Sequence, residues 1–303
     1  MSATANHAQR GTSLGALLMS LSMLGFAAMD AMSKFLVADY PIVQTLWIRY
    51  VVYAGFAVMV ARKAGVRRKA VSRRPWLQTI RSLIAVVEGA VFVLAFAYLP
   101  LAETHAVAAT SPLIVIALSV PLLRERVGLH RWLAVGAGFV GVLLIVRPGF
   151  EELTWPLALP LAGAFLWGLY QIMVRMCARD DSPETTLLWS AFVGLAAVSV
   201  VAPFYWRTPD LLAASLMLGI GVLGALSHFA LIKALEFAEA SAVQPYGYTL
   251  LVWAALLGAL VFADIPGIWT MIGGAIVETL IICHLQRVNT KKRNEEKINH
   301  KCN

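Results

Sequence analysis

The chain has 303 residues, of which 59% are hydrophobic and only 14% charged, and its mean hydropathy is +0.74. A water-soluble domain carries roughly 25% charged residues, so this composition excludes an ordinary soluble protein. The net charge of +8 would suit a nucleic-acid partner. The basic residues, however, gather in short segments between apolar blocks, so we interpret them as a membrane topology signal and expect no nucleic-acid partner.

The apolar blocks are long enough to cross a bilayer as helices, because a hydrocarbon core of roughly 30 Å needs about 20 helical residues. Their residues do not alternate between polar and apolar, as the strands of a β-barrel would. The sequence therefore predicts an all-α membrane protein with ten transmembrane helices. In chain order these are 14–37, 42–61, 79–98, 103–123, 130–146, 157–177, 185–204, 211–234, 241–262 and 267–285.

The first block, 14–37, is predicted to be a spanning helix and not a cleaved signal peptide. It is longer than the apolar region of a signal peptide, Asp30 and Lys34 interrupt it, and no pair of small residues for cleavage follows. Residues 1–13 then form a cytoplasmic N-terminus.

Orientation follows from the basic residues. With the N-terminus in the cytoplasm, 21 of the 25 Lys and Arg residues fall on the cytoplasmic side, eight of them between residues 62 and 81. Cytoplasmic loops carry such an excess of basic residues. The sequence therefore predicts a multi-pass protein of the bacterial cytoplasmic (inner) membrane with both termini in the cytoplasm.

Two stretches of the chain repeat each other. Residues 102–107 read Ala-Glu-Thr-His-Ala-Val, and residues 238–243 read Ala-Glu-Ala-Ser-Ala-Val. A long apolar segment, an acidic turn and a Trp-x3-Gly motif follow each copy. Five helices per copy is an odd number, so the second copy enters the membrane from the opposite face. The sequence predicts two inverted five-helix repeats, 14–148 and 157–285, and a disordered cytoplasmic tail at 286–303.

Prolines interrupt two corresponding helices, the fourth at Pro112 and the ninth at Pro245. Each proline removes a backbone donor and can kink its helix. We expect kinked or gating helices at these two positions, and half-helix ends of the kind that transporters use near their substrates.

Longer strings of residues carry a resemblance to a known family. The first string reads Tyr-Leu-Pro-Leu-Ala-Glu at 98–103 and continues through Arg-Glu-Arg-Val-Gly at 124–128 to Arg-Pro-Gly at 147–149. The second includes Pro245, Tyr248-Thr249, Trp253-Ala254 and Phe-x-Asp-x-Pro at 262–266. These residues resemble the EamA-type branch of the drug/metabolite transporter superfamily. The resemblance implies ten helices, inverted repeats and transport of amino acids, nucleosides, vitamins or xenobiotics, often as export.

Charged residues inside the predicted helices need a reason, because each costs on the order of 2.5–3.5 kcal/mol on insertion scales. Glu88 lies near the bilayer midplane, while Asp30, Lys34 and Arg49 lie in the outer halves of the first two helices. Asp30 and Lys34 are four residues apart and can pair on one helix face. Two interpretations stay open: a structural cluster of ion pairs that ties the first three helices together, or a site for a zwitterionic substrate or a proton.

His228 and a set of aromatic and amide residues complete the predicted site. A histidine inside the membrane can relay protons, or it can simply bond a neighbouring helix. The other side chains fall on helices that we expect around a central cavity: Trp47, Trp167, Tyr170, Gln171, Gln244, Tyr246, Tyr248 and Trp253. An aromatic cavity with few charges suits aromatic or hydrophobic amino acids and flat metabolites.

We therefore predict a secondary transporter that exports small organic metabolites by alternating access, with or without a coupled proton or counter-solute. Amino acids with aromatic or hydrophobic side chains are the first expectation, and nucleosides, vitamins or drugs are the alternatives within the superfamily. From other classes, an intramembrane enzyme lacks support because no His-Glu-x-x-His or phosphate-loop motif occurs, and a scaffold would not need charges inside the membrane. Three cysteines without paired spacing predict neither disulfides nor a metal site, and we expect no cofactor.

Overall fold

The computed structural model of the chain describes residues 2–125 and 155–264, together with Gly128, Trp132, Gly136, Val140, Gly267, Ile268 and Ile272. Every regular element in this part of the chain is a helix. The first half contains α1 (Ser2–Leu36), α2 (Ile42–Arg62), α3 (Val66–Lys69), α4 (Pro75–Tyr98), α5 (Leu101–Ala108), α6 (Ser111–Leu118) and the π-helical turn η1 (Ser119–Leu123). The second half contains η2 (Trp155–Leu157), α8 (Ala158–Cys177), α9 (Pro183–Ser199), η3 (Ala202–Tyr205), α10 (Leu211–Phe237), α11 (Ala240–Gly247) and α12 (Thr249–Phe262).

Among the described residues, seven segments are long and apolar enough to cross a membrane: Ser13–Leu36, Ile42–Arg62, Pro75–Tyr98, Leu101–Leu123, Trp155–Cys177, Leu211–Phe237 and Ala242–Phe262. They match seven of the predicted spans. The span predicted at 185–204 corresponds to α9, which has 17 residues, and the short helix η3 that follows it. Three predicted segments lie outside the described residues, apart from six single positions: the spans at 130–146 and 267–285 and the tail at 286–303. Ten helices therefore remain a prediction.

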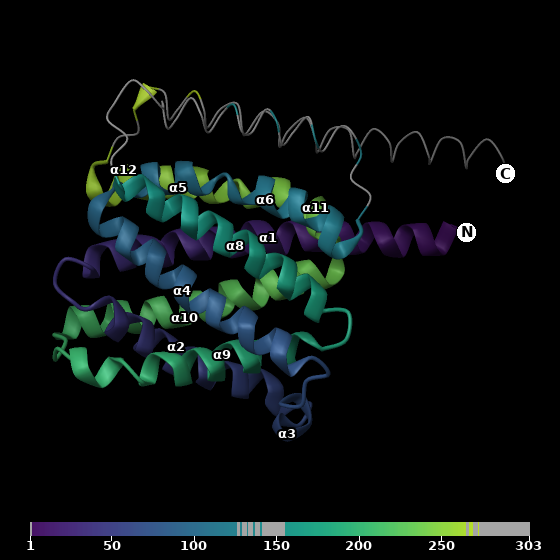
Figure 1. Cartoon of the computed structure of the whole chain (residues 1–303), viewed down its shortest axis with the longest axis horizontal. Helices are drawn as coiled ribbons and strands as arrows, with labels where there is room; N and C mark the ends of the chain where they lie inside the picture. Colours follow the sequence, from purple (N-terminus) through teal and green to yellow (C-terminus); the bar gives the residue numbers. More distant parts are fainter. Residues whose placement is uncertain are drawn as a thin grey trace.

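The long helices lie side by side, and successive helices run in opposite directions (Figure 1). The loop between α8 and α9 lies at the end of the molecule where α1 begins, so α1 and α8 point in opposite directions (Figure 1). This is the orientation that an inverted repeat requires, since α1 and α8 are the first helices of the two predicted copies.

Helix packing has the same internal symmetry. In the two predicted copies, α1 corresponds to α8, α2 to α9, α4 to α10, and the broken helix α5–α6 to α11–α12. The contact of α1 with α10 then has its counterpart in the contact of α8 with α4. The contact of α2 with α10 likewise corresponds to that of α9 with α4, and the contact of α1 with α12 to that of α8 with α6. The helices α2 and α9 are counterparts and pack on each other. The described helices therefore interlock across the two copies around a pseudo-two-fold axis.

The fourth and ninth predicted spans are each broken in the middle. A turn at Ala109 and Thr110 separates α5 from α6, and Pro112 is the second residue of α6. A turn at Tyr248 separates α11 from α12, three residues after Pro245. Both interruptions fall close to the prolines that predicted them, because a proline has no N–H to continue the backbone ladder.

Both broken helices also end in the same way. Arg124 and Ala263 adopt left-handed backbone conformations, with φ of 57° and 55°. The next residue then donates its N–H back into the helix, from Glu125 to the Ser119 carbonyl at 3.2 Å and from Asp264 to the Gly258 carbonyl at 3.1 Å. These bonds satisfy carbonyls that the helix end would leave free.

Each of these turns directs an acidic side chain toward the other repeat. Asp264 Oδ2 accepts a 2.6 Å bond from Nζ of Lys34 on α1. Glu125 Oε1 accepts a 3.2 Å bond from the backbone N–H of Ala240, the first residue of α11. The two bonds tie the copies together at opposite ends of the bundle.

Small residues allow close approach between helices. A methyl group built at Gly221 of α10 would lie 2.6 Å from Cβ of Val52 on α2, and one built at Gly194 of α9 would lie 2.2 Å from the ring of Tyr50. Contacts this short cannot form without movement of the helices, so both glycines are required by the packing.

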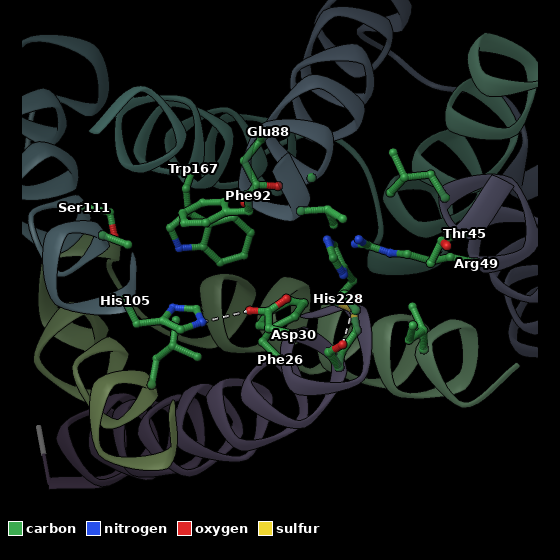
Figure 2. Close-up of a pocket in the computed structure, with 18 residues that line it drawn as sticks. Phe26, Asp30, Thr45, Arg49, Glu88, Phe92, His105, Ser111, Trp167 and His228 are labelled. Carbon is green, nitrogen blue, oxygen red and sulfur yellow. Dashed lines mark hydrogen bonds and ion pairs between the residues drawn. The ribbon is translucent and has the colours of Figure 1, made fainter. Parts of the chain in front are cut away.

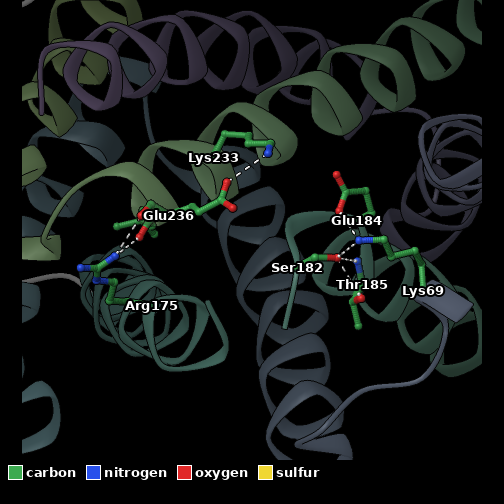
Figure 3. A network of polar contacts seen from close by, with 8 residues as sticks. Lys69, Arg175, Ser182, Glu184, Thr185, Lys233 and Glu236 are labelled. Carbon is green, nitrogen blue, oxygen red and sulfur yellow. Dashed lines mark hydrogen bonds and ion pairs between the residues drawn. The ribbon is translucent and has the colours of Figure 1, made fainter. Parts of the chain in front are cut away.

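Polar contacts join helices at the end that carries the basic loop (Figure 3). Lys69 of α3 donates to Ser182 Oγ at 2.8 Å and to Glu184 Oε2 at 3.2 Å. Arg175 of α8 donates to the carbonyl of Leu235 on α10 at 2.6 Å. The short helix α3 is thus held on α9, and α8 on α10.

Candidate functional site

A cavity lies between the two copies and contains about 680 Å³ of space free of protein atoms, including its opening. We call it the central cavity (Figure 2). Helices of both copies line it, which places it close to the pseudo-two-fold axis, where transporters built from inverted repeats bind their substrates. Its lining residues are Phe26, Met29, Asp30, Ser33, Thr45, Leu46, Arg49, Glu88, Gly89, Phe92, Val93, His105, Ala108, Ser111, Trp167, Ile220, His228 and Leu250.

Three of the four charged residues predicted for the site meet in this cavity. Asp30 comes from α1, Arg49 from α2 and Glu88 from α4 (Figure 2). The fourth, Lys34, does not line it and pairs instead with Asp264.

The expected pairing of Asp30 with Lys34 is therefore wrong. Asp30 Oδ2 lies 3.3 Å from Nε2 of His105 on α5, a contact between two largely buried side chains. Lys34 stands one helical turn nearer the end of the bundle, where the left-handed turn after α12 brings Asp264 and the ring of Phe262 to its ammonium group.

Arg49 lies between two glycines of neighbouring helices. A methyl group built at Gly89 of α4 would lie 3.4 Å from its Nη1, and one built at Gly224 of α10 would lie 3.2 Å from its Nε. The side chain is 4% exposed, and its Nε has no hydrogen-bond partner among the described residues. A buried donor without an acceptor is costly, so the unpaired Nε is an unusual feature of the cavity wall.

Glu88 is buried at the cavity wall beside Gly89. Within the part of the chain that the structure describes, no Lys, Arg or His nitrogen lies within 4.0 Å of its carboxylate. The ion-pair cluster that would tie the first three helices together is therefore not present among the described residues: Lys34 pairs with Asp264, and Asp30 contacts His105 on the fourth predicted span.

His228 is held by its own helix. Its Nδ1 donates to the Gly224 carbonyl at 2.9 Å, which leaves Nε2 as an acceptor in the neutral ring. Aromatic rings surround the imidazole, with centroid distances of 4.8 Å to Phe26, 5.6 Å to Tyr53 and 5.9 Å to Tyr170. The predicted bond to a neighbouring helix is therefore replaced by one within α10.

Trp167 is the predicted aromatic residue that lines the central cavity. Its ring meets Phe26 edge to face at 5.3 Å, and Phe92 forms another part of the wall (Figure 2). These rings give the cavity an apolar side next to its charged groups.

Four other predicted lining residues, all aromatic, line neither this cavity nor the neighbouring one described below. Trp47 donates from Nε1 to Ser199 Oγ at 2.9 Å. Tyr170 stacks behind Trp167 at 5.5 Å, away from the cavity. Tyr246 packs at the margin of the hydrophobic core, and Trp253 is half-buried on α12.

The remaining predicted residues form a second cavity, which we call the amide cavity. Together with its opening it spans about 350 Å³ of space without protein atoms, and it is lined by Gln171, Gln244 and Tyr248 together with apolar residues of α1 and α12. Nε2 of Gln244 donates to Oε1 of Gln171 at 3.0 Å. The amide cavity adjoins the central cavity, because both are lined by His105, Ala108, Ser111, Trp167 and Leu250.

Among the lining residues that sequence reasoning missed, five are aromatic or polar and help to shape the wall: Phe26, Thr45, Phe92, His105 and Ser111. His105 carried a signal, since it lies in the duplicated motif where the second copy has Ser241. The imidazole of His105 thus stands where the other copy of the motif has only the small side chain of Ser241, a difference that indicates a role for His105 in the first copy alone. The other four residues are of types common in any membrane helix.

Among the described residues, no three His, Cys, Asp or Glu side chains lie close enough together to hold a metal ion. The polar groups of the two cavities are suited to hydrogen bonds and ion pairs with an organic solute.

Comparison with known proteins shows a match to the EamA-like transporter family over residues 13–147 and 154–282. A riboflavin transporter of Vibrio cholerae is 29% identical over 287 residues, which cover 93% of this chain and 96% of that protein. An S-adenosylmethionine uptake transporter of Rickettsia bellii is 25% identical over 294 residues, covering 95% and 99%. A solved crystal structure matches with a TM-score of 0.62 at 18% identity, over 91% of this chain and 99% of that one, a likeness of fold alone.

Proposed function

The chain belongs to the EamA-like transporter family, and on that premise we propose that it carries a metabolite with a flat nitrogen heterocycle through the central cavity. The relatives are transporters, so the chain is a multi-pass membrane transporter of small molecules and not an enzyme.

The central cavity is the observation that supports this substrate class. It sets the rings of Phe26, Phe92 and Trp167 beside the charged groups of Asp30, Arg49 and Glu88. A flat ring gains by burial against the aromatic wall, at roughly 25 cal/mol per Å². A hydroxylated or charged tail gains hydrogen bonds from the charged side. Riboflavin joins a three-ring heterocycle to a polyhydroxyl chain, and S-adenosylmethionine joins adenine to a charged chain, so both have the two parts that the cavity accommodates.

Amino acids remain the second candidate. The carboxylates of Asp30 and Glu88 can hold an ammonium group, and Arg49 can hold a carboxylate, which is the pair of charges that a zwitterion needs. The names of the relatives favour the vitamin and metabolite alternative over amino acids.

Transport by whole cells tests the proposal and its direction. Cells that express the chain are given labelled riboflavin, S-adenosylmethionine or phenylalanine, and accumulation and efflux from preloaded cells are both measured. We expect a heterocyclic solute to move in at least one direction faster than in cells without the chain. Transport of phenylalanine alone would replace the proposal by the amino-acid candidate.

A pair of tryptophan variants connects that activity to the cavity. Trp167→Leu removes the indole ring from the aromatic wall and leaves Phe26 and Phe92, so we expect transport to fall by about tenfold or more, a loss of roughly 1.4 kcal/mol. Trp253→Leu alters a half-buried tryptophan outside both cavities and should transport like the wild type at equal expression. Equal activity of both variants would show that the substrate does not use the central cavity.

A further inference from the structure

The amide cavity contains buried polar atoms that have no partner among the described residues. Oε1 of Gln244, the hydroxyl of Tyr248 and both ring nitrogens of His105 make no hydrogen bond. The side chains belong to residues that are 1%, 8% and 3% exposed, and all three line the amide cavity. His105 lies near Asp30 but without the geometry of a hydrogen bond.

Such atoms are rare in folded proteins, because each unpaired buried group costs the free energy of its lost hydration. Here the side chains that carry them line one small space between helices of both copies: α5 brings His105, and the junction of α11 and α12 brings Gln244 and Tyr248, with the paired Gln171 of α8 beside them. Their arrangement is explained if a ligand supplies the missing partners.

The donors and acceptors indicate which chemical group would fit. The bond from Gln244 Nε2 to Gln171 Oε1 leaves the Gln244 oxygen as an acceptor without a partner among the described residues. The amide nitrogen of Gln171, on the other side chain of this pair, is by its chemistry a donor. The hydroxyl of Tyr248 can act in either sense. The wall therefore presents a donor and an acceptor as close neighbours, which complements a ring edge where an N–H group stands beside a carbonyl or a bare ring nitrogen.

We propose that the amide cavity is the subsite that reads the hydrogen-bonding edge of the transported heterocycle, through Gln171, Gln244 and Tyr248. This inference rests on the proposed function, and it assigns the selection of the ring to the residues of the amide cavity. A cyclic imide, as in the isoalloxazine of riboflavin, has such an edge, and so does the aminopyrimidine side of adenine.

The position of the two cavities supports this division of roles. The amide cavity offers neutral amides and a phenol, whereas Asp30, Arg49 and Glu88 belong to the central cavity alone. Trp167 and Ser111 line both. A ring held beside Trp167 thus reaches the amides with its edge, while its tail stays among the charged groups.

Binding of riboflavin to the purified protein, followed by quenching of flavin fluorescence, tests the inference. Tyr248→Phe removes one oxygen that has no partner in the empty site, so its melting temperature should equal or exceed that of the wild type. Its affinity for riboflavin should nevertheless fall about fivefold, the effect of one neutral hydrogen bond. Tyr246→Phe, two residues away and outside both cavities, is the matched control and should bind like the wild type.

A change in the ligand, instead of the protein, tests the same hydrogen bond. Riboflavin methylated at its imide nitrogen lacks the donor of the edge, so the wild type should bind it about tenfold more weakly than riboflavin. In Gln244→Leu this preference should disappear, because the acceptor is gone as well. Gln244→Glu keeps an acceptor and the size of the side chain, so it should retain the preference and would show that the loss in the leucine variant comes from the missing acceptor.

The outcomes separate the two proposals. If the wild type binds riboflavin, but Tyr248→Phe keeps its affinity and Gln244→Leu keeps the preference over the methylated form, the subsite is overturned and the proposed function stands. The same holds if Tyr248→Phe loses stability and affinity together, since that result indicates a structural role. If the wild type binds and transports neither riboflavin nor an adenosyl compound, the proposed function fails and the subsite falls with it.

Discussion

Two opposite charges one helical turn apart on α1 serve different parts of the molecule. Asp30 faces the central cavity beside His105, whereas Lys34 clamps the end of α12 through Asp264. The spacing of four residues permitted a pair on α1, but such a pair gains only about 0.2–0.5 kcal/mol on a helix surface. Partners on neighbouring helices, brought close by the fold, outweigh so weak a local preference.

Exchanging the charges of the Lys34–Asp264 pair tests this clamp. Lys34→Asp and Asp264→Lys each place like charges together, and each should lower the melting temperature of the protein in detergent. The double exchange restores opposite charges and should recover most of that loss, with a coupling free energy of about 0.5–1 kcal/mol because both side chains are partly exposed. Additive effects of the two single changes would show that the pair contributes nothing.

Glu88 is the residue for which we expect the largest effect on transport. Glu88→Gln keeps the size of the side chain and its capacity for hydrogen bonds while removing the charge from the cavity. We expect expression and melting temperature to stay close to those of the wild type, and the rate of transport to fall by about tenfold or more.

The matched control for this change is Glu236→Gln, which breaks a partly exposed pair with Lys233 at the end of α10 and should leave transport unchanged. A Glu88→Gln protein that transports at the wild-type rate at every pH would mean that the carboxylate is only structural.

For single residues, the sequence predicted the positions of ionisable side chains inside the helices better than those of aromatic side chains. The sequence singles out Asp30, Arg49, Glu88 and His228 because a charge or imidazole in an apolar block needs a polar environment. All four line the central cavity, whereas Lys34, expected there for the same reason, pairs with Asp264 outside it. Trp47 and Trp253 lie outside that cavity. An aromatic side chain packs equally well in a cavity wall, a core or a helix interface, so its residue type alone does not predict that it lines a cavity.

At the scale of helices and turns, some sequence features predicted the structure and others gave no indication of it. Hydropathy located the long helices, because a span of about 20 apolar residues has few other uses. The prolines indicated the two broken helices. The left-handed turns at Arg124 and Ala263 carried no glycine to mark them, and so the clamps formed by Glu125 and Asp264 emerged only from the structure.

Helix packing predicts opposite effects for two glycine substitutions. Gly221→Ala would place a methyl group 2.6 Å from the branched Cβ of Val52, so we expect a loss of about 1–3 kcal/mol, measured as a lower melting temperature. Gly55→Ala meets no atom within 4 Å and should leave the melting temperature equal or slightly higher, because alanine is the better helix former. A Gly221→Ala protein as stable as Gly55→Ala would contradict the close packing of α10 on α2.

For the whole molecule, duplication explains where the cavity lies. The helices of the two copies interlock so that the main contacts between described helices occur in related pairs, and the space near the axis is lined by both copies. The repeated motif at 102–107 and 238–243 predicted the duplication. It did not predict the asymmetry of the cavity, in which the first copy supplies the charges, because divergence between repeats follows function and leaves the fold intact.

Orientation in the membrane is the prediction that belongs to this scale. The basic segment from Arg62 to Arg74 should lie in the cytoplasm, and Arg207 on the opposite side. Single cysteines introduced at the two positions in a background without the three native cysteines report it. An impermeant thiol reagent added to intact cells should label the cysteine at position 207 and not the one in the basic segment, and the reverse pattern would invert the topology.

Counterflow in liposomes tests the central claim most directly, because it needs neither a coupling ion nor a known direction of transport. Vesicles that contain the purified protein are loaded with unlabelled riboflavin and diluted into labelled riboflavin. We predict a transient accumulation of label that is absent from protein-free vesicles and strongly reduced with Trp167→Leu. Vesicles that show counterflow of labelled phenylalanine, but none of riboflavin or S-adenosylmethionine, would contradict the claim that this cavity carries flat heterocyclic metabolites.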